Sequence, residues 1–465
     1  MVELSQIISS LSPQKQKLLE RLLKEKGIDL SKPKEQEQAA TFHSRIPRIS
    51  RHGELPLSYA QQRLWFLDQL VPGRSFYNNP FAVRAQGLLD MASMIGAFES
   101  LVRRHEALRT SFRSVEGRPV QVINDYVETS VPLIDLMELD DEERQQEAKR
   151  IADEEAEQPF DLTTAPLVRA RLIKIGEKDY IGLITTHEIM SDMWSLLVLL
   201  RELAVMYGAL STGTTPPLPE LPLQYVDYAA WQREWFKGEV LQKQLEYWKQ
   251  HLEGAPPTLE LLTDHPRPPV QSFNGAMENF AFSSELSESL RELSRREGVT
   301  MFMLLLAAFN TLLYRYTGQE DIVVGSTIMN RDRAEIEGVI GVFVNALALR
   351  TELRRDVSFK ELLQKVKGVA LEGYANADVP FEKVVEEMRP ERDVSRAPIF
   401  QVMLSMQDFP RPAVRASGVR FSSYDQEIRT TKFDLTLSFH ETRKDVIDGF
   451  FQYSTDSSMP EPSNA

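Results

Sequence analysis

The residues best suited to chemistry lie in the stretch TTHEIMSDMWS, residues 185–195. A run rich in β-forming residues, YIGLITT, leads to His187, and the apolar run that starts at Leu196 predicts a helix after it. His187, Glu188 and Asp192 have the side chains needed to accept and donate protons. Because neighbouring residues of a strand face opposite ways, we expect only one of His187 and Glu188 to face a cavity and the other to pack behind it.

Several common reaction centres are excluded because residues they need are missing. The His-Glu pair of a zinc protease requires a second histidine at position 191, which is serine here. A serine hydrolase requires Gly-x-Ser-x-Gly, and neither Ser191 nor Ser195 has those glycines. The chain has no GxGxxG or GxxxxGK[ST] loop for a nucleotide and no cysteine for catalysis or zinc. We therefore expect no metal and no resident cofactor.

The composition is that of a soluble globular protein. A length of 465 residues exceeds one ordinary core and predicts two lobes. The net charge of -14 argues against nucleic acid, although a local basic patch for an acidic carrier protein is compatible with it. The longest apolar run, residues 301–314, is too short for a membrane span, and the N-terminus lacks signal-peptide features. The lack of cysteine fits the cytoplasm.

Patterns along the chain predict a mixed α/β fold without a strict βαβ rhythm. An amphipathic helix at 12–27 suits either docking to another chain or packing on its own domain. The Pro- and Thr-rich stretch 211–222 indicates the boundary between two lobes. The expected segments are an N-terminal helical segment 1–34, a linker 35–54, lobes at 55–222 and 223–456, and a tail 457–465. In the second lobe we expect helices at 238–253, 284–297, 299–316, 358–373 and 380–388, and strands at 277–282, 321–328, 342–351, 398–406 and 433–439.

Seven segments stand out in order along the chain. They are SYAQQRLWFLDQL (58–70), RHEALRTSF (104–112), HEIMSDMWS (187–195), YVDYAAWQ (225–232), IGVFVNALALR (340–350, preceded by MNRDR), ADVPFEKVVEEM (377–388) and RDVSRAPIFQVML (392–404). In content and order they resemble the seven motifs of condensation domains of nonribosomal peptide synthetases, in which the third motif usually reads HHxxxDGxS. The resemblance covers residues 55–456.

The resemblance implies two lobes similar to chloramphenicol acetyltransferase, set in a V as a pseudo-dimer with a tunnel between them. Donor and acceptor peptidyl carrier proteins would deliver phosphopantetheine thioesters from opposite ends. The acceptor amine would attack the donor thioester to form an amide in the biosynthesis of a secondary metabolite. The implied partners are these carriers and other synthetase modules, in the cytoplasm, with neither nucleic acid nor membrane.

The resemblance also implies roles for individual residues. Glu188 occupies the position of the catalytic histidine, and His187 is structural. Asp192 pairs with Arg331. The residues that line or support the substrate tunnel are Met193, Trp194, Ser195, Asn345 and Ser395.

Two residues depart from the family pattern. Glu188 replaces a histidine; a free glutamate titrates near pH 4.3, burial would raise that value, and its charge would hold an acceptor amine as unreactive ammonium. Met193 replaces a glycine and is expected to narrow the tunnel or to strain a turn that favours positive φ.

Two functional hypotheses follow. The first is a condensation domain that forms amide bonds, with Glu188 as an unusual base or with the amine positioned by other groups, and with activity impaired by Glu188 and Met193. The second is a catalytically inactive scaffold that binds carrier proteins. A weaker third reading, a remnant without a role, is motivated by the family's last helix, which is not seen after residues 451–456.

Overall fold

The computed structural model describes residues 45–390, 393–407, 414–424, 429–441 and 446–456. The chain divides into two compact units, Met1–Pro47 and Arg48–Ala465, and every element below belongs to the second. The predicted N-terminal segment 1–34 and the tail 457–465 lie outside the described residues.

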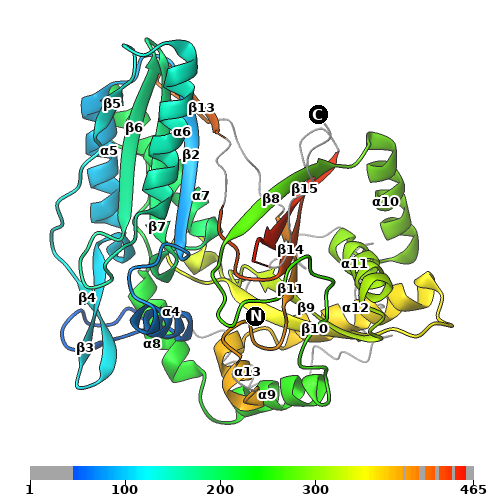
Figure 1. The fold of residues 1–465 in the computed structure, drawn as a ribbon. Coiled ribbons are helices and arrows are strands. Elements are labelled where there is room, and N and C mark those ends of the chain that lie inside the picture. Colours follow the sequence, from blue (N-terminus) through cyan, green and yellow to red (C-terminus); the bar gives the residue numbers. More distant parts are fainter. Residues whose placement is uncertain (1–44, 391–392, 408–413, 425–428, 442–445, 457–465) are drawn as a thin grey trace, which may run out of the picture. The chain divides into compact units, whose positions relative to one another are not determined.

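The first six-stranded sheet carries the strand that ends at His187 (Figure 1). Its strands in spatial order are β12 (Val414–Ala416), β13 (Val419–Ser423), β2 (Asn78–Gln86), β7 (Asp179–His187), β6 (Val168–Gly176) and β5 (Leu133–Asp135). All neighbours are antiparallel except β5 and β6. Helix α6 (Asp141–Glu157) packs on β2, β6 and β7. This highly charged helix buries a narrow apolar stripe, made of Ala148, Ile151 and Ala152, together with one charged residue, Glu155.

Helix α7 (Met193–Ser211) follows the predicted reaction centre and packs against α5 (Met91–Arg104). By length and composition it is the one single helix of the described residues that meets the criteria for a membrane span. Its packing indicates a core helix instead, because Leu196 and Leu199 are buried. Glu202 in its middle is also buried, and its carboxylate lies 2.8 Å from Nε2 of His105.

The second six-stranded sheet is built from the C-terminal half of the chain. Its strands in spatial order are β10 (Asn345–Glu352), β9 (Asp321–Ile328), β11 (Val402–Gln407), β14 (Leu435–Glu441), β15 (Ile447–Ser454) and β8 (Gly275–Ala281). Strand β11 is parallel to both of its neighbours, β9 and β14. The helices of this half are α9 (Gly238–Leu252), α10 (Ser284–Glu297), α11 (Met301–Thr317), α12 (Phe359–Ala375) and α13 (Phe381–Met388).

Local sequence signals explain where these helices begin and end. The Thr300 side chain accepts the N–H of Met303 at the start of α11, and Gly318 ends that helix at φ 70°. A capping box between Ser358 and Glu361 starts α12. The five helices predicted for this half are therefore confirmed, each within a few residues of its expected bounds.

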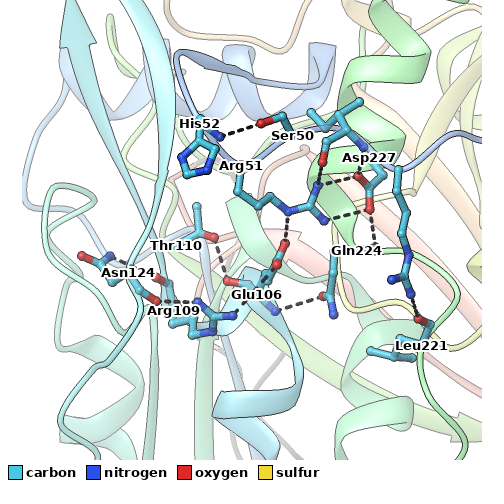
Figure 2. Close-up of polar contacts among 12 residues, drawn as sticks. Ser50, Arg51, His52, Glu106, Arg109, Thr110, Asn124, Leu221, Gln224 and Asp227 are labelled. Atoms are coloured by element: carbon cyan, nitrogen blue, oxygen red, sulfur yellow. Dashed lines mark hydrogen bonds and ion pairs between the residues drawn. The ribbon is translucent and has the colours of Figure 1, made fainter.

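A smaller sheet of β1 (Leu55–Pro56), β4 (Arg118–Ile123) and β3 (Thr110–Val115) lies beside α4 (Tyr59–Leu70) and α8 (Tyr225–Trp235). Figure 2 shows how Arg51 ties this region together. Its guanidinium donates to Glu106 at 2.9 Å and to both carboxylate oxygens of Asp227 at 2.6 and 2.9 Å. Arg109 donates to the carbonyl of Asn124 at 2.5 Å and lies 4.0 Å from Glu106.

One segment of the C-terminal half crosses to the first sheet. Strand β13 pairs with β2 in antiparallel register, with Arg420 opposite Gln86 and Ser423 opposite Val83. A boundary at residue 222 therefore does not separate the two sheets completely. The sequence patterns also missed β15, whose residues alternate only weakly between apolar and polar types.

Candidate active site

His187 is the last residue of β7 and occupies a packing position. It is 2% exposed, and its Nδ1 accepts the N–H of Ile189 at 3.1 Å. The Phe160 ring lies edge-on to it at 6.1 Å, and the Tyr77 ring lies at 6.2 Å. Burial lowers the pKa of His187 to about 4, because the charged imidazolium would lose its hydration. The ring is therefore neutral at physiological pH.

The burial of His187 predicts a specific dependence of stability on pH. In the unfolded chain its pKa is about 6.5, whereas the folded value is about 4. The unfolded state therefore takes up the proton first, and stability is lost as the pH falls from about 6.5 towards 4. We expect this residue alone to lower the free energy of unfolding by about 2 kcal/mol between pH 7 and pH 5.

Urea unfolding of the native chain and of His187→Asn at several pH values measures this contribution. Asparagine keeps an acceptor for the Ile189 N–H but does not titrate. Because the other histidines are common to both proteins, their contributions cancel in the difference. Parallel stability curves for the two proteins over this range would contradict the prediction.

Glu188 faces away from the packing behind His187 and forms an ion pair. Strand β7 ends at His187, and a short 3-10 helix, η3 (Glu188–Met190), begins at Glu188, whose N–H donates to the Tyr77 carbonyl at 2.8 Å. The Glu188 carboxylate accepts a hydrogen bond from Nζ of Lys432. The Glu188 side chain is 20% exposed and the Lys432 side chain 39% exposed, so the pair is accessible to solvent. One lone pair of the carboxylate is thereby occupied.

Sequence reasoning missed Lys432. It lies 244 residues from Glu188, in the short segment before β14. Its Nζ also lies 5.2 Å from the centre of the Tyr77 ring, which favours a cation there. No local pattern distinguishes this lysine from the other lysines of the chain, so only the tertiary structure identifies it.

Further charges surround Glu188. Arg63 on α4 forms an ion pair with Glu382 on α13 at 3.3 Å. Burial raises the pKa of the Tyr77 hydroxyl, the positive charge of Arg63 opposes that shift, and the negative charge of Glu188 adds to it. Two cations, Arg63 and Lys432, are therefore close enough to influence this part of the site electrostatically.

Asp192 and Arg331 form a buried ion pair 3.1 Å apart, and both side chains are 2% exposed. Asp192 is the N-cap of α7, and its Oδ1 accepts the N–H of Ser195 at 2.7 Å. Its Oδ2 accepts the N–H of Phe343 at 2.9 Å and that of Val344 at 3.3 Å. The carboxylate therefore connects the start of α7 to the loop that precedes β10.

Arg331 is held from several sides. It donates to Ser195 Oγ at 2.6 Å and to the carbonyls of Ile336 and Val339, each at 2.8 Å. Burial lowers the pKa of Arg331, and Asp192 opposes that shift. The Phe343 ring lies 4.0 Å from the guanidinium carbon. These contacts make Arg331 a structural cation of the site.

Gly341 completes this frame because no larger residue fits there. Ser195 Oγ donates to its carbonyl at 2.7 Å and accepts its N–H at 3.0 Å. A Cβ on Gly341 would lie 1.8 Å from the Tyr225 ring. Tyr225 in turn donates to the carbonyl of Val342 at 2.7 Å.

The remaining predicted tunnel residues differ in their surroundings. Ser195 is 0% exposed and accepts a hydrogen bond from Arg331. Asn345 is 9% exposed; its side-chain NH2 donates to the carbonyls of residues 377 and 379, and its side-chain oxygen accepts the N–H of residue 381. Ser395 donates to Asp393 at 2.6 Å and braces a turn. Trp194 donates through Nε1 to the carbonyl of residue 337 at 2.8 Å.

Met193 corrects one expectation. It is the first residue of α7 and is not among the residues with positive φ, so it strains no turn. The helical start favoured by the Asp192 cap accepts any L-residue at this position. The residue is 40% exposed, and the remaining consequence of replacing glycine is the added bulk of the side chain. Among the described residues, no group of three histidine, aspartate or glutamate side chains is arranged to hold a metal.

Comparisons with known proteins agree with this fold. A family model described as the Condensation domain matches residues 51–457. Linear gramicidin synthase subunits C and D of Brevibacillus parabrevis are 46% identical over 423 residues and 48% identical over 416 residues. The chain therefore belongs to the condensation domain family of nonribosomal peptide synthetases. It spans only 5% and 8% of the length of these two relatives, while 90% and 89% of the chain is covered.

Solved structures confirm the mixed α/β fold of the chloramphenicol acetyltransferase type. The X-domain from teicoplanin biosynthesis matches with a TM-score of 0.81 at 28% identity, over 90% of this chain and 93% of that one. A four-domain nonribosomal peptide synthetase bound to AMP and glycine matches with a TM-score of 0.78 at 22% identity, over 90% of this chain and 32% of that one. The second likeness shows the fold alone.

Proposed function

We propose that this chain serves a nonribosomal peptide synthetase as a condensation domain that binds two carrier proteins but forms amide bonds only slowly. The carriers present a donor thioester and an acceptor amine, each on a phosphopantetheine arm, and the domain binds no cofactor of its own. The amine nitrogen would attack the thioester carbonyl, the C–N bond would form, the C–S bond would break, and the amine proton would have to be accepted. The chain would work in the cytoplasm beside other synthetase modules.

The observation that carries this proposal is the ion pair between Glu188 and Lys432. A general base must have a free lone pair within reach of the proton that it removes. One oxygen of the Glu188 carboxylate is engaged by Lys432, whose ammonium competes with an acceptor amine for the charge of that carboxylate. The buried contacts of Asp192, Arg331 and Ser195 are intact, so the domain keeps its fold around a carboxylate that is already held in an ion pair.

The substitution Glu188→Gln tests whether Glu188 is a working base. With loaded donor and acceptor carriers, we expect the native chain and this variant to form product at rates within about twofold of each other. A catalytic base would instead make the variant slower by roughly 10²–10⁴-fold. Product is measured by mass spectrometry, and carrier docking by fluorescence anisotropy. A large loss of rate in Glu188→Gln, or the absence of docking to either carrier, would overturn the proposal.

A second candidate is a binding platform for a further protein. The structural relative at 28% identity is an X-domain that was also solved in complex with OxyB from teicoplanin biosynthesis. That structure supports a role in which a condensation-type fold recruits a partner instead of joining substrates. Two measurements separate these candidates. A pure platform would not dock the donor and acceptor carriers for reaction, and Glu188→His would form no product with them.

A further inference from the structure

Phe273 has a backbone conformation that a bulky residue seldom adopts. Its φ is 65°, in the left-handed region, where a side chain crowds the backbone. Such conformations persist when surrounding contacts hold them, and they concentrate at functional sites. Here the Phe273 ring stacks on the Phe76 ring, with centroids 4.2 Å apart and planes 18° from parallel. The two residues come from opposite halves of the chain.

The backbone of Phe273 holds the segment that carries Lys432. The Phe273 carbonyl accepts the N–H of Thr431 at 2.9 Å, and the next residue, Asn274, forms an isolated β-bridge with Thr430. The Gln271 side chain donates to the carbonyl of Lys432 at 3.1 Å. Residues 271–274 and 430–432 are therefore bonded to each other at three consecutive positions.

The Phe76 side of the stack leads to Glu188. Phe76 lies edge-on to Tyr77, with ring centroids 4.5 Å apart. The backbone carbonyl of Tyr77 accepts a hydrogen bond from the N–H of Glu188. The Tyr77 ring lies 5.2 Å from Nζ of Lys432. The stack thus joins the two backbone segments whose side chains meet in the ion pair.

We infer that Phe273 is a positioning residue for the ion pair between Glu188 and Lys432: its ring, stacked on Phe76, places the lysine segment where the ammonium reaches the carboxylate. The consequence for the reaction rests on the proposed function, in which the ion pair makes Glu188 a poor base. The inference itself concerns geometry and holds whether or not the domain condenses substrates.

Acetylation of lysines by sulfosuccinimidyl acetate, followed by peptide mass spectrometry, tests this inference on the full chain without carriers. We expect Lys432 to react about fivefold faster in Phe273→Gly than in the native chain, because an exposed ion pair protects by roughly that factor. Phe273→Tyr keeps the ring and should preserve native protection, and Phe76→Ala should expose Lys432 as Phe273→Gly does. The acetylation rate of Lys432 in Glu188→Gln gives the value expected when the ion pair is lost completely.

The controls separate a local effect from unfolding. Lys174, paired with Asp135 at 2.8 Å in the first sheet, should react at the native rate in every variant. Glycine also relieves the positive φ, so Phe273→Gly should unfold as cooperatively as the native chain. Native labelling of Lys432 in Phe273→Gly, or equal labelling in Phe273→Tyr and Phe273→Gly, would overturn the inference. A native chain that condenses rapidly would overturn the proposed function alone.

Discussion

A chain with both Glu188→His and Met193→Gly is expected to form amide bonds at least about 100 times faster than the native chain, the lower end of what a general base contributes. Histidine has a pKa near 6.5 in water, so its neutral form accepts a proton at physiological pH without attracting the amine as ammonium. The buried contacts behind the site require no further substitution, because Asp192 and Arg331 are already paired at 3.1 Å. Met193→Gly removes the side chain of a residue that is 40% exposed.

The single variants are the matched controls for this gain. Glu188→His should supply most of the increase, whereas Met193→Gly alone should stay near the native rate, because it restores space but no base. The rates are compared with the same loaded carriers at saturating concentration. A double variant that folds, docks both carriers and still condenses at the native rate would show that the missing proton acceptor is not what limits this domain.

The substitution Asp192→Ala is expected to lower the free energy of unfolding by about 3–5 kcal/mol, the cost of breaking a buried ion pair by removing one partner. It would leave the Arg331 guanidinium without a carboxylate at a position where its side chain is 2% exposed. It would also remove the cap of α7 and the acceptor for the N–H of Phe343. Urea unfolding measures the loss.

Two comparisons make that result interpretable. Asp135→Ala removes a carboxylate from an exposed pair with Lys174 and should cost less than about 1 kcal/mol. Asp192→Asn keeps the shape and one acceptor, so its effect should lie between those of the two alanine variants. A loss in Asp192→Ala as small as that in Asp135→Ala would contradict a structural role for the buried pair.

Much of the local structure around the site could be predicted from the sequence. The β-rich run before His187 and the apolar run after Asp192 correspond to β7 and α7, because strand and helix patterns depend on nearby residues. The order of the motifs, through their family resemblance, also indicated Arg331 as the partner of Asp192. Periodicity could not indicate the crossing of β13 to the first sheet, because the pairing of distant strands depends on topology.

The sequence alone determined that the family's histidine is replaced by Glu188, that the neighbouring His187 remains, and that no cysteine or nucleotide loop offers a different chemistry. Only the tertiary structure decided which groups surround Glu188. Lys432 reaches Glu188 from 244 residues away. The segment that carries it is bonded to the backbone of Phe273, whose φ is 65° and whose ring stacks on Phe76 from the other half of the chain. The sequence specifies the type of each side chain, but the charges that surround a side chain depend on which distant segments fold against it.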